Sequence, residues 1–311
     1  MKVLSIVVPV WNEQETIPVF LETMNKVHHE SLSEYMFEYW FIDDGSIDDT
    51  LKVLRSQQLK NPEEVHYLSF SRNFGKEAGL YAGLEQATGE YVAVMDVDLQ
   101  DPPELLPDMV NGVSSGEWDA VGTRRITRVG EPPIRTFFSK LFYKVINHIS
   151  DTQIVEGARD YRVMSRQMVD SLLSLTEYNR FSKGMFSWVG FRQKYIEFEN
   201  RDRVAGQTSW SFWSLFKYSI EGVVAFSQVP LAFVSILGLL AFTAAFAGAL
   251  IIIIRALTVT GSSVAGWPSM VVIMLFMGGI QLLSLGIVGR YVSSIYLEVK
   301  KRPIYITREK R

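Results

Sequence analysis

Short apolar runs rich in branched and aromatic residues alternate with helix-like stretches through the first two hundred residues. We expect β-strands at Val3–Val10, Glu38–Asp43, Val65–Phe70, Tyr91–Asp96 and Ala120–Gly122, and helices at Glu15–Lys26, Thr50–Gln58 and Gly75–Ala87. Thr152–Met164 and Arg192–Glu199 are candidate further strands, and Arg166–Leu175 is a candidate helix. Strand–helix alternation of this kind is typical of a mainly parallel sheet covered by helices. The pattern therefore predicts an α/β domain.

The pattern changes after residue 205, where aromatic and apolar residues crowd together as they do in amphipathic helices at a bilayer surface. Residues 222–254 and 256–289 then contain no Asp, Glu, Lys or Arg. About 20 apolar residues suffice to cross a bilayer as a helix. The sequence thus predicts interfacial helices over 206–228, a first transmembrane helix over 229–257 and a second over 267–296.

The distribution of basic residues predicts how the two spans are oriented in the membrane. The connection between the two spans has no basic residue, whereas the tail over 297–311 carries Lys300, Lys301, Arg302, Arg308, Lys310 and Arg311 against Glu298 and Glu309. By the positive-inside rule this tail and the N-terminal domain, residues 1–205, lie in the cytoplasm of a multi-pass plasma-membrane protein. The chain has no cysteine, which suits that compartment. A net charge of −3 gives no indication of a nucleic-acid partner, and we expect none.

The fourth expected strand opens into closely spaced carboxylates. It continues as Asp96-Val97-Asp98-Leu99-Gln100-Asp101-Pro102-Pro103-Glu104. A buried strand cannot hold adjacent unpaired carboxylates, but the loop at its carboxyl end can, and α/β sheets place their ligands there. The side-chain oxygens of Asp96, Asp98 and Gln100 are hard ligands suited to Mg²⁺ or Mn²⁺. The motif therefore predicts a metal and diphosphate site at a strand end.

Polar residues also follow the first two strands. Asn12 and Glu13 could lie near a ribose, and Asp44 near a base, in a nucleotide pocket at the strand ends. Turn formation by Asp-Gly-Ser and helix capping by Asp48 or Asp49 explain the same residues without a ligand. Taken with the carboxylates after the fourth strand, the pattern favours the pocket.

Cationic residues supply candidates for phosphate binding. Arg72 and Lys76 follow the third strand, where a helix start with solvated charges is an equal alternative. Arg124 and Arg135, with Ser139, precede or enter an aromatic segment and suit an anionic lipid headgroup, because guanidinium pairs bidentately with phosphate. A general attraction to anionic bilayer lipids competes with that interpretation. Arg203 could fold over a diphosphate, although its segment also resembles a bare linker.

Together these motifs resemble the polyprenyl-phosphate glycosyltransferases of glycosyltransferase family 2, of the bactoprenol glucosyltransferase and dolichol-phosphate mannose synthase type. The resemblance covers essentially the whole chain and rests on Val10–Glu13, Asp43–Ser46, Ser71–Lys76, Asp96–Glu104, Gly122–Arg124, Asp160–Arg162 and Arg203–Gly206. It implies a GT-A (Rossmann-like) α/β domain followed by interfacial amphipathic helices and two transmembrane helices.

Site residues follow from the resemblance residue by residue. It implies that Pro9, Asn12, Glu13, Asp44, Arg72, Lys76 and Arg203 bind the donor nucleotide, that Asp96, Asp98 and Gln100 bind the divalent metal, and that Arg124, Arg135 and Ser139 bind the acceptor phosphate. Asp160 matches an acidic family position near the acceptor, so Asp96, Asp98 and Asp160 are the expected catalytic residues. Val97 stands where Ala is common and Trp11 where Tyr is common, which leaves the choice of sugar open.

The resemblance implies inverting, Mg²⁺- or Mn²⁺-dependent transfer of a hexose from a UDP-sugar to undecaprenyl phosphate at the cytoplasmic face of a bacterial plasma membrane. It also implies a homo-oligomer, a tetramer by similarity to the bactoprenol glucosyltransferases. The alternatives are a dolichol-phosphate-mannose-type synthase that uses GDP-mannose and a non-catalytic nucleotide-sugar-binding membrane protein. A processive polysaccharide synthase is disfavoured, since the sequence has no Gln-x-x-Arg-Trp motif.

Overall fold

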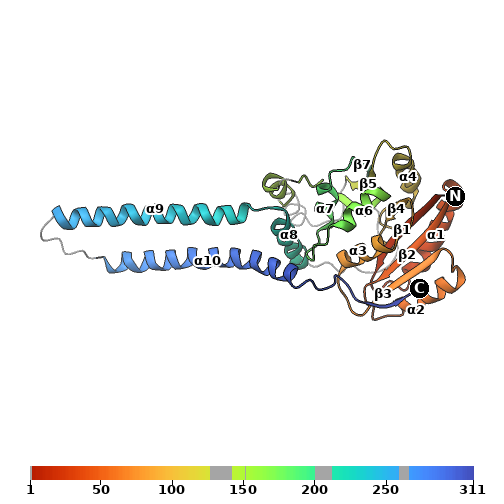
Figure 1. Cartoon of the computed structure of the whole chain (residues 1–311), viewed down its shortest axis with the longest axis horizontal. Helices are drawn as coiled ribbons and strands as arrows, with labels where there is room; N and C mark the ends of the chain where they lie inside the picture. The colour runs from red at the N-terminus through yellow and green to blue at the C-terminus, as the bar shows by residue number, and fades with distance from the viewer. Residues whose placement is uncertain (1, 127–141, 151, 200–211, 259–265) are drawn as a thin grey trace.

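One mixed sheet forms the centre of the N-terminal domain (Figure 1). The computed structural model describes residues 2–126, 142–150, 152–199, 212–258 and 266–311. The strands are β1 (Lys2–Val10), β2 (Tyr35–Asp43), β3 (Val65–Phe70), β4 (Tyr91–Val94), β5 (Ala120–Arg125), β6 (Ala158–Ser165), β7 (Gln193–Phe198) and β8 (Thr307–Lys310). Their order in the sheet is β7-β5-β6-β4-β1-β2-β3-β8.

The four central strands β4, β1, β2 and β3 are parallel, as the sequence predicts. The strands β6 and β8 run antiparallel to β4 and β3, respectively. β5 is antiparallel to β6 and parallel to β7, so it points the same way as β4. The carboxyl ends of β1 to β5 consequently lie along one edge of the sheet.

Helices cover both faces of the sheet. The helical elements around it are α1 (Thr16–Ser31), α2 (Thr50–Lys60), α3 (Lys76–Gln86), the 3₁₀ turn η1 (Pro103–Leu105), α4 (Leu106–Ser114), α6 (Arg166–Ser174) and α7 (Ser182–Trp188). Because strand side chains alternate, Leu4, Ile6 and Val8 of β1 pack in the core beneath α1, α2 and α4. Val7 packs on the opposite face, with residues of α3, α6 and α7.

The strand and helix predictions for the domain are confirmed, with most ends shifted by a few residues; the strand expected over Thr152–Met164 begins only at Ala158. The pattern did not predict α4, α7 or β8. Residues 307–310 read Thr-Arg-Glu-Lys and show no apolar alternation. This segment pairs through its backbone at the edge of the sheet, where side chains need not be buried.

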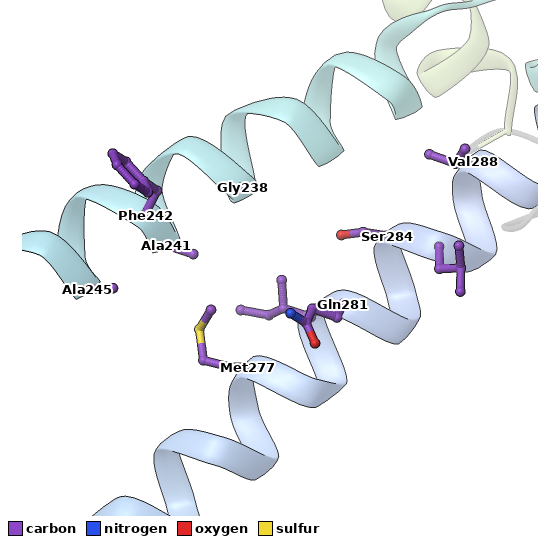
Figure 2. A pocket seen from close by; sticks show the side chains of 10 residues that line it. Gly238, Ala241, Phe242, Ala245, Met277, Gln281, Ser284 and Val288 are labelled. Carbon is purple, nitrogen blue, oxygen red and sulfur yellow. The ribbon is translucent and has the colours of Figure 1, made fainter.

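Two long apolar helices project from one end of the domain, side by side (Figure 1). They are α9 (Val229–Thr258) and α10 (Trp267–Val299). Segments Val229–Ile252 and Met270–Val299 are long and apolar enough to cross a membrane, and neither is buried inside the protein. The facing sides of the two helices line a groove that includes Gln281 and Ser284 of α10 and small residues of α9 (Figure 2).

Helix α8 (Phe212–Phe226) joins these helices to the domain. A Cβ atom on Gly184 of α7 would lie 2.5 Å from the Phe226 ring, so the glycine allows α8 to pack closely. The domain-proximal part of α10 is held by an ion pair between Arg290 and Glu221 (3.5 Å). The Tyr291 hydroxyl also donates a hydrogen bond to the Ser227 carbonyl (2.7 Å). The membrane-length helices are therefore fixed to the domain at their base.

Helix α3 packs on β1 at a distance that only glycine allows. A Cβ atom on Gly83 would lie 2.1 Å from Cγ1 of Val7, whose side chain is fully buried. We expect Gly83→Ala to destabilise the domain by about 1–3 kcal/mol through overpacking, although alanine favours helix formation. The measurement is thermal unfolding of the detergent-solubilised protein. Gly289→Ala, in open space on α10, is the control; an unchanged Tm for Gly83→Ala would contradict the packing argument.

Candidate active site

The sheet topology brings the sequence motifs to one edge. Residues after β1, β2, β3 and β4 meet there because these neighbouring strands are parallel. Strand β6 runs the opposite way and pairs Arg162 with Val94, so Asp160 lies beyond the carboxyl end of β4. The end of β5 reaches the same edge, where Arg124 pairs with Ala158.

The turn after β4 is held by its apolar residues. Met95, Val97 and Leu99 are buried in the core, and Leu99 has a φ of 55°. The alternating residues, Asp96 and Asp98, are the two carboxylates of the motif. Asp98 is also buried, and its Oδ1 accepts a hydrogen bond from the backbone N–H of Gln100 (3.2 Å). The sequence alternation thus places the carboxylates at a fixed, sharp turn.

Lys76 lies between two of the expected catalytic carboxylates. Its Nζ is 2.6 Å from Oδ1 of Asp96 and 2.7 Å from Oδ2 of Asp160. Burial disfavours the charged amine, but the attraction of Asp160 and Asp96 is stronger and raises the pKa of Lys76 above its usual range. Burial likewise opposes the charge of Asp160, and Lys76 outweighs it and lowers the pKa of that carboxyl. Lys76 and Asp160 are therefore both charged at neutral pH.

A second cation, Arg159, was not predicted from the sequence. Its Nε donates to Oδ1 of the buried Asp101 at 2.8 Å, and its Nη2 lies 3.8 Å from Oδ2 of Asp96. The fully buried Arg162 stacks on the Phe186 ring, 3.5 Å from its centroid, and donates to the backbone carbonyls of Arg159 and Asp160. Arg159 is next to Asp160 in the sequence and Arg162 is two residues from it. This closeness to a candidate catalytic residue is the signal that could have pointed to both arginines.

Asp44 organises the loop after β3. Its carboxylate accepts hydrogen bonds from the backbone N–H groups of Phe74 (2.6 Å) and Gly75 (2.9 Å). Burial raises the pKa of Asp44 to about 6, against the effect of these hydrogen bonds. Gly45 has a φ of 67°, and a Cβ atom there would lie 2.5 Å from the backbone carbon of Arg72. The two loops are thus in direct contact.

Asn12 and Glu13 take part in local structure. The Asn12 side-chain oxygen accepts from the Ile47 N–H (2.9 Å), and a Glu13 carboxylate oxygen accepts from the Thr16 hydroxyl (2.6 Å). The contact of Asn12 fixes the loop after β1 against the loop after β2, whereas that of Glu13 is local. Of the two expected caps, Asp49 makes no side-chain hydrogen bond to α2, and Asp48 accepts one from the backbone N–H of Thr50 (3.0 Å). Pro9 lies next to α3, with its Cβ 3.3 Å from the position of a Cβ on Gly79.

Phosphate-binding candidates are only partly described. Arg72 stacks on Phe74, with its guanidinium carbon 3.9 Å from the ring centroid. Arg124 forms an ion pair with Glu197 (3.8 Å) at the same sheet edge. Arg135, Ser139 and Arg203 lie outside the residues that the structure describes.

The residues after β4 fit a divalent metal that is shared with a phosphate ligand. Among the described residues, no group of three His, Cys, Asp or Glu side chains is placed to hold a metal. Asp96 and Asp98 provide two carboxylates, and Gln100 adds an amide oxygen. Mg²⁺ is commonly held in this way, by one or two carboxylates together with substrate phosphates. Lys76 and Arg159 beside Asp96 show that this carboxylate already faces positive charge.

Comparison with known proteins assigns the class. Residues 5–173 match the model of glycosyl transferase family 2. The chain belongs to this family. It is 42% identical to the putative glycosyltransferase CsbB of Bacillus subtilis, and the match covers 98% of this chain and 91% of that protein. It is 40% identical to the bactoprenol glucosyl transferase of Shigella phage SfX over 99% of both chains.

A solved structure of glucosyl-3-phosphoglycerate synthase from Mycobacterium tuberculosis, in complex with Mn²⁺, UDP-glucose and phosphoglyceric acid, is 19% identical to this chain. The match has a TM-score of 0.45 and covers 72% of this chain and 78% of that one. Structural similarity at this level gives no information about the residues of the site.

The ion pairs of Lys76 with Asp96 and Asp160 predict that removing the lysine charge lowers the stability of the protein. We expect Lys76→Met to lower the free energy of unfolding by about 1–3 kcal/mol, because Asp96 and Asp160 lose their shared counter-charge in a partly buried site. Adding Asp160→Asn should recover part of the loss, which denaturant unfolding of the four-member mutant cycle measures. A double variant no more stable than Lys76→Met would contradict the coupling.

Asp44 predicts a pH dependence of stability. Since its pKa is raised from 3.8 to about 6 in the folded state, its contribution is fully present below about pH 4 and is lost as the pH rises through about 6. The shift corresponds to at most about 3 kcal/mol. Asn does not titrate, so Asp44→Asn should gain Tm relative to the wild type between pH 4 and 7.5. A constant Tm difference over that interval would show that Asp44 is not shifted.

Proposed function

We propose that this protein transfers a hexose, with glucose or N-acetylglucosamine favoured, from a UDP-sugar to undecaprenyl phosphate or a related polyprenyl phosphate. The supporting observation is that one chain joins a carboxylate–cation cluster at a sheet edge to two membrane-length helices fixed at the base of the same domain. Full-length similarity to proteins named bactoprenol glucosyl transferase supports both the sugar and the lipid acceptor.

The donor is proposed to bind along the carboxyl ends of β1 to β4. Pro9, Asn12, Glu13, Asp44 and Arg72 would surround the nucleotide, and Arg203 would cover the diphosphate. Asp96, Asp98 and Gln100 would hold Mg²⁺ or Mn²⁺ on that diphosphate, where such an ion neutralises charge on the departing UDP. Lys76 would add a second positive charge at the same place.

The acceptor needs little activation. A phosphate monoester is largely ionised near neutral pH because its second pKa is about 6. Lys76 keeps Asp160 ionised, so this carboxylate is suited to an electrostatic and positioning role in the proposed reaction. Catalysis would then depend mainly on orientation of the two phosphorylated substrates. In-line attack would invert the anomeric centre and give a β-linked lipid phosphate from an α-linked donor.

We propose that the reaction takes place at the cytoplasmic face of a bacterial plasma membrane. Strand β8 follows α10 and pairs with β3, so the chain end and the sheet lie on the same side of the two helices. The basic tail supports a cytoplasmic position for both. Residues 1–205 would form the catalytic domain, with Arg124, Arg135 and Ser139 at the lipid phosphate. A homotetramer is part of the same proposal.

A transfer assay tests the proposal. The purified protein is incubated with undecaprenyl phosphate, Mn²⁺ or Mg²⁺ and a panel of radiolabelled nucleotide sugars that includes GDP-mannose, and the products are extracted into organic solvent. We expect UDP-glucose or UDP-N-acetylglucosamine to label the lipid phase and EDTA to abolish the label. Asp98→Asn should reduce transfer by about a hundredfold or more, because metal stabilisation of the leaving group contributes several kcal/mol.

Asp108→Asn is the matched control, since Asp108 lies on α4 in a depression lined by α4, β5 and β7 residues. It should retain wild-type transfer. Label from GDP-mannose alone would favour the dolichol-phosphate-mannose type. Nucleotide binding without label from any donor would favour a non-catalytic binding protein. An α-linked product, seen by NMR, would contradict inversion.

A further inference from the structure

The C-terminal segment after α10 returns to the carboxyl end of β3, on the side of the sheet that carries the site. In Figure 1 it runs from the base of α10 across the domain to the chain end beside β3. Strand β8 is antiparallel to β3, and Phe70 at the carboxyl end of β3 pairs with Thr307. Residues 303–306 therefore lie beside the loop that follows β3. We call residues 303–311 the C-terminal strap.

The strap contacts the loop Ser71–Gly75 directly. The backbone N–H of Ser71 donates a hydrogen bond to the carbonyl of Ile306 (2.9 Å). Tyr305 stacks on Phe70, with ring centroids 4.9 Å apart, and Phe70 packs edge-to-face on Phe74 at 5.7 Å. Phe74 carries the guanidinium of Arg72 on its ring. A continuous row of aromatic contacts thus runs from the strap to a candidate donor-binding arginine.

The other side of this loop is also fixed. Gly45 approaches the Arg72 backbone, and the Asp44 carboxylate holds the N–H groups of Phe74 and Gly75. The loop is therefore packed between the turn after β2 and the strap. If either support were lost, only the other would hold the loop in this conformation. Loss of the strap would be measurable, since aromatic pairs of this kind each contribute packing energy.

The strap has its own anchors to the domain. Glu309 forms an ion pair with Arg55 of α2 and accepts a hydrogen bond from the Tyr67 hydroxyl (2.5 Å). The Tyr305 hydroxyl donates to Glu85 of α3 (2.5 Å). These contacts fix the position of the strap independently of the loop Ser71–Gly75. The strap can therefore hold the loop in place.

The strap also limits the distance between the domain and α10. Only seven residues separate the end of α10 at Val299 from the start of β8 at Thr307. An extended chain spans at most about 3.6 Å per residue, so Thr307, which pairs with the carboxyl end of β3, stays within about 29 Å of Val299. The loop is thus supported by a segment that begins at the end of the second membrane-length helix.

We propose that the C-terminal strap is a positioning element for donor binding: through Tyr305 and the backbone of Ile306 it holds Ser71–Gly75 in the conformation that receives the nucleotide. This inference rests on the proposed function for the identity of the donor. The strap touches neither substrate in this scheme. It acts through the loop, and it makes donor binding depend on the segment that follows the second membrane-length helix.

The test uses the full-length protein with point substitutions in the strap. Tyr305→Ala removes the ring from Phe70, whereas Tyr305→Phe keeps the ring and loses only the hydrogen bond to Glu85. Arg308→Ala, at an exposed strap position, is the matched control. Three quantities are measured: hydrogen–deuterium exchange of peptides covering 71–75, the Kd for UDP, and the KM and kcat for UDP-sugar and lipid phosphate.

We expect Tyr305→Ala to accelerate exchange at 71–75 and to raise the Kd for UDP and the KM for UDP-sugar by roughly three- to tenfold, the effect of losing one aromatic pair. The kcat and the KM for the lipid should stay near wild type. Tyr305→Phe and Arg308→Ala should behave like the wild type.

Unchanged exchange at 71–75 in Tyr305→Ala would overturn the proposal. So would faster exchange across the whole sheet, which would show a general loss of stability, or faster loop exchange with an unchanged Kd for UDP. If the protein transferred no sugar from any donor, the exchange data and the UDP affinity would still decide the role of the strap. Failure of the proposed function is thereby distinguished from failure of this inference.

Discussion

The arrangement of the site depends on one constraint, that carboxylates gathered at a sheet edge need cations between them. Asp96 and Asp160 come from strands of opposite direction and share the ammonium of Lys76. Asp101 and Asp96 face Arg159. Partly buried like charges would otherwise repel one another and lose hydration. The cations therefore allow the strand ends to converge, and they leave a preorganised charge pattern at the place where the proposed diphosphate and divalent ion would bind.

Most of the fold follows from local patterns. Apolar runs such as Val3–Val10 and Tyr91–Val94 are buried on both faces, and this is why they are continuous in sequence and easily recognised. Parallel pairing then places the residues after β1 to β4 at one edge, so the convergence of Asn12, Asp44, Lys76 and Asp96 could be predicted without a structure. The partners within that edge could not. Which carboxylate Lys76 meets depends on the register of β6 against β4, and register is a tertiary property.

The elements that the sequence did not reveal share a physical cause. Strand β8 has no apolar face, and its pairing with β3 rests on backbone hydrogen bonds and on contacts made by Tyr305 and Glu309. Arg159 looked like an ordinary charged residue on a strand, and Arg162 was noted only as part of the Asp160–Arg162 motif, yet both are drawn inward by carboxylate, carbonyl and aromatic partners. Side chains whose role is set by distant partners leave no periodic signal along the chain.

The domain is connected to the two membrane-length helices at several points, and this has consequences for a reaction at a bilayer. Helix α8 packs through Phe226 on α7, Glu298 at the end of α10 accepts hydrogen bonds from the N–H groups of Tyr178 and Asn179, and the strap pairs with β3. A single tether would let the sheet edge rotate freely relative to the membrane. Several short connections restrict that rotation, so in the proposed reaction the orientation in which a lipid phosphate would meet a bound donor would be set by the fold before either substrate arrives.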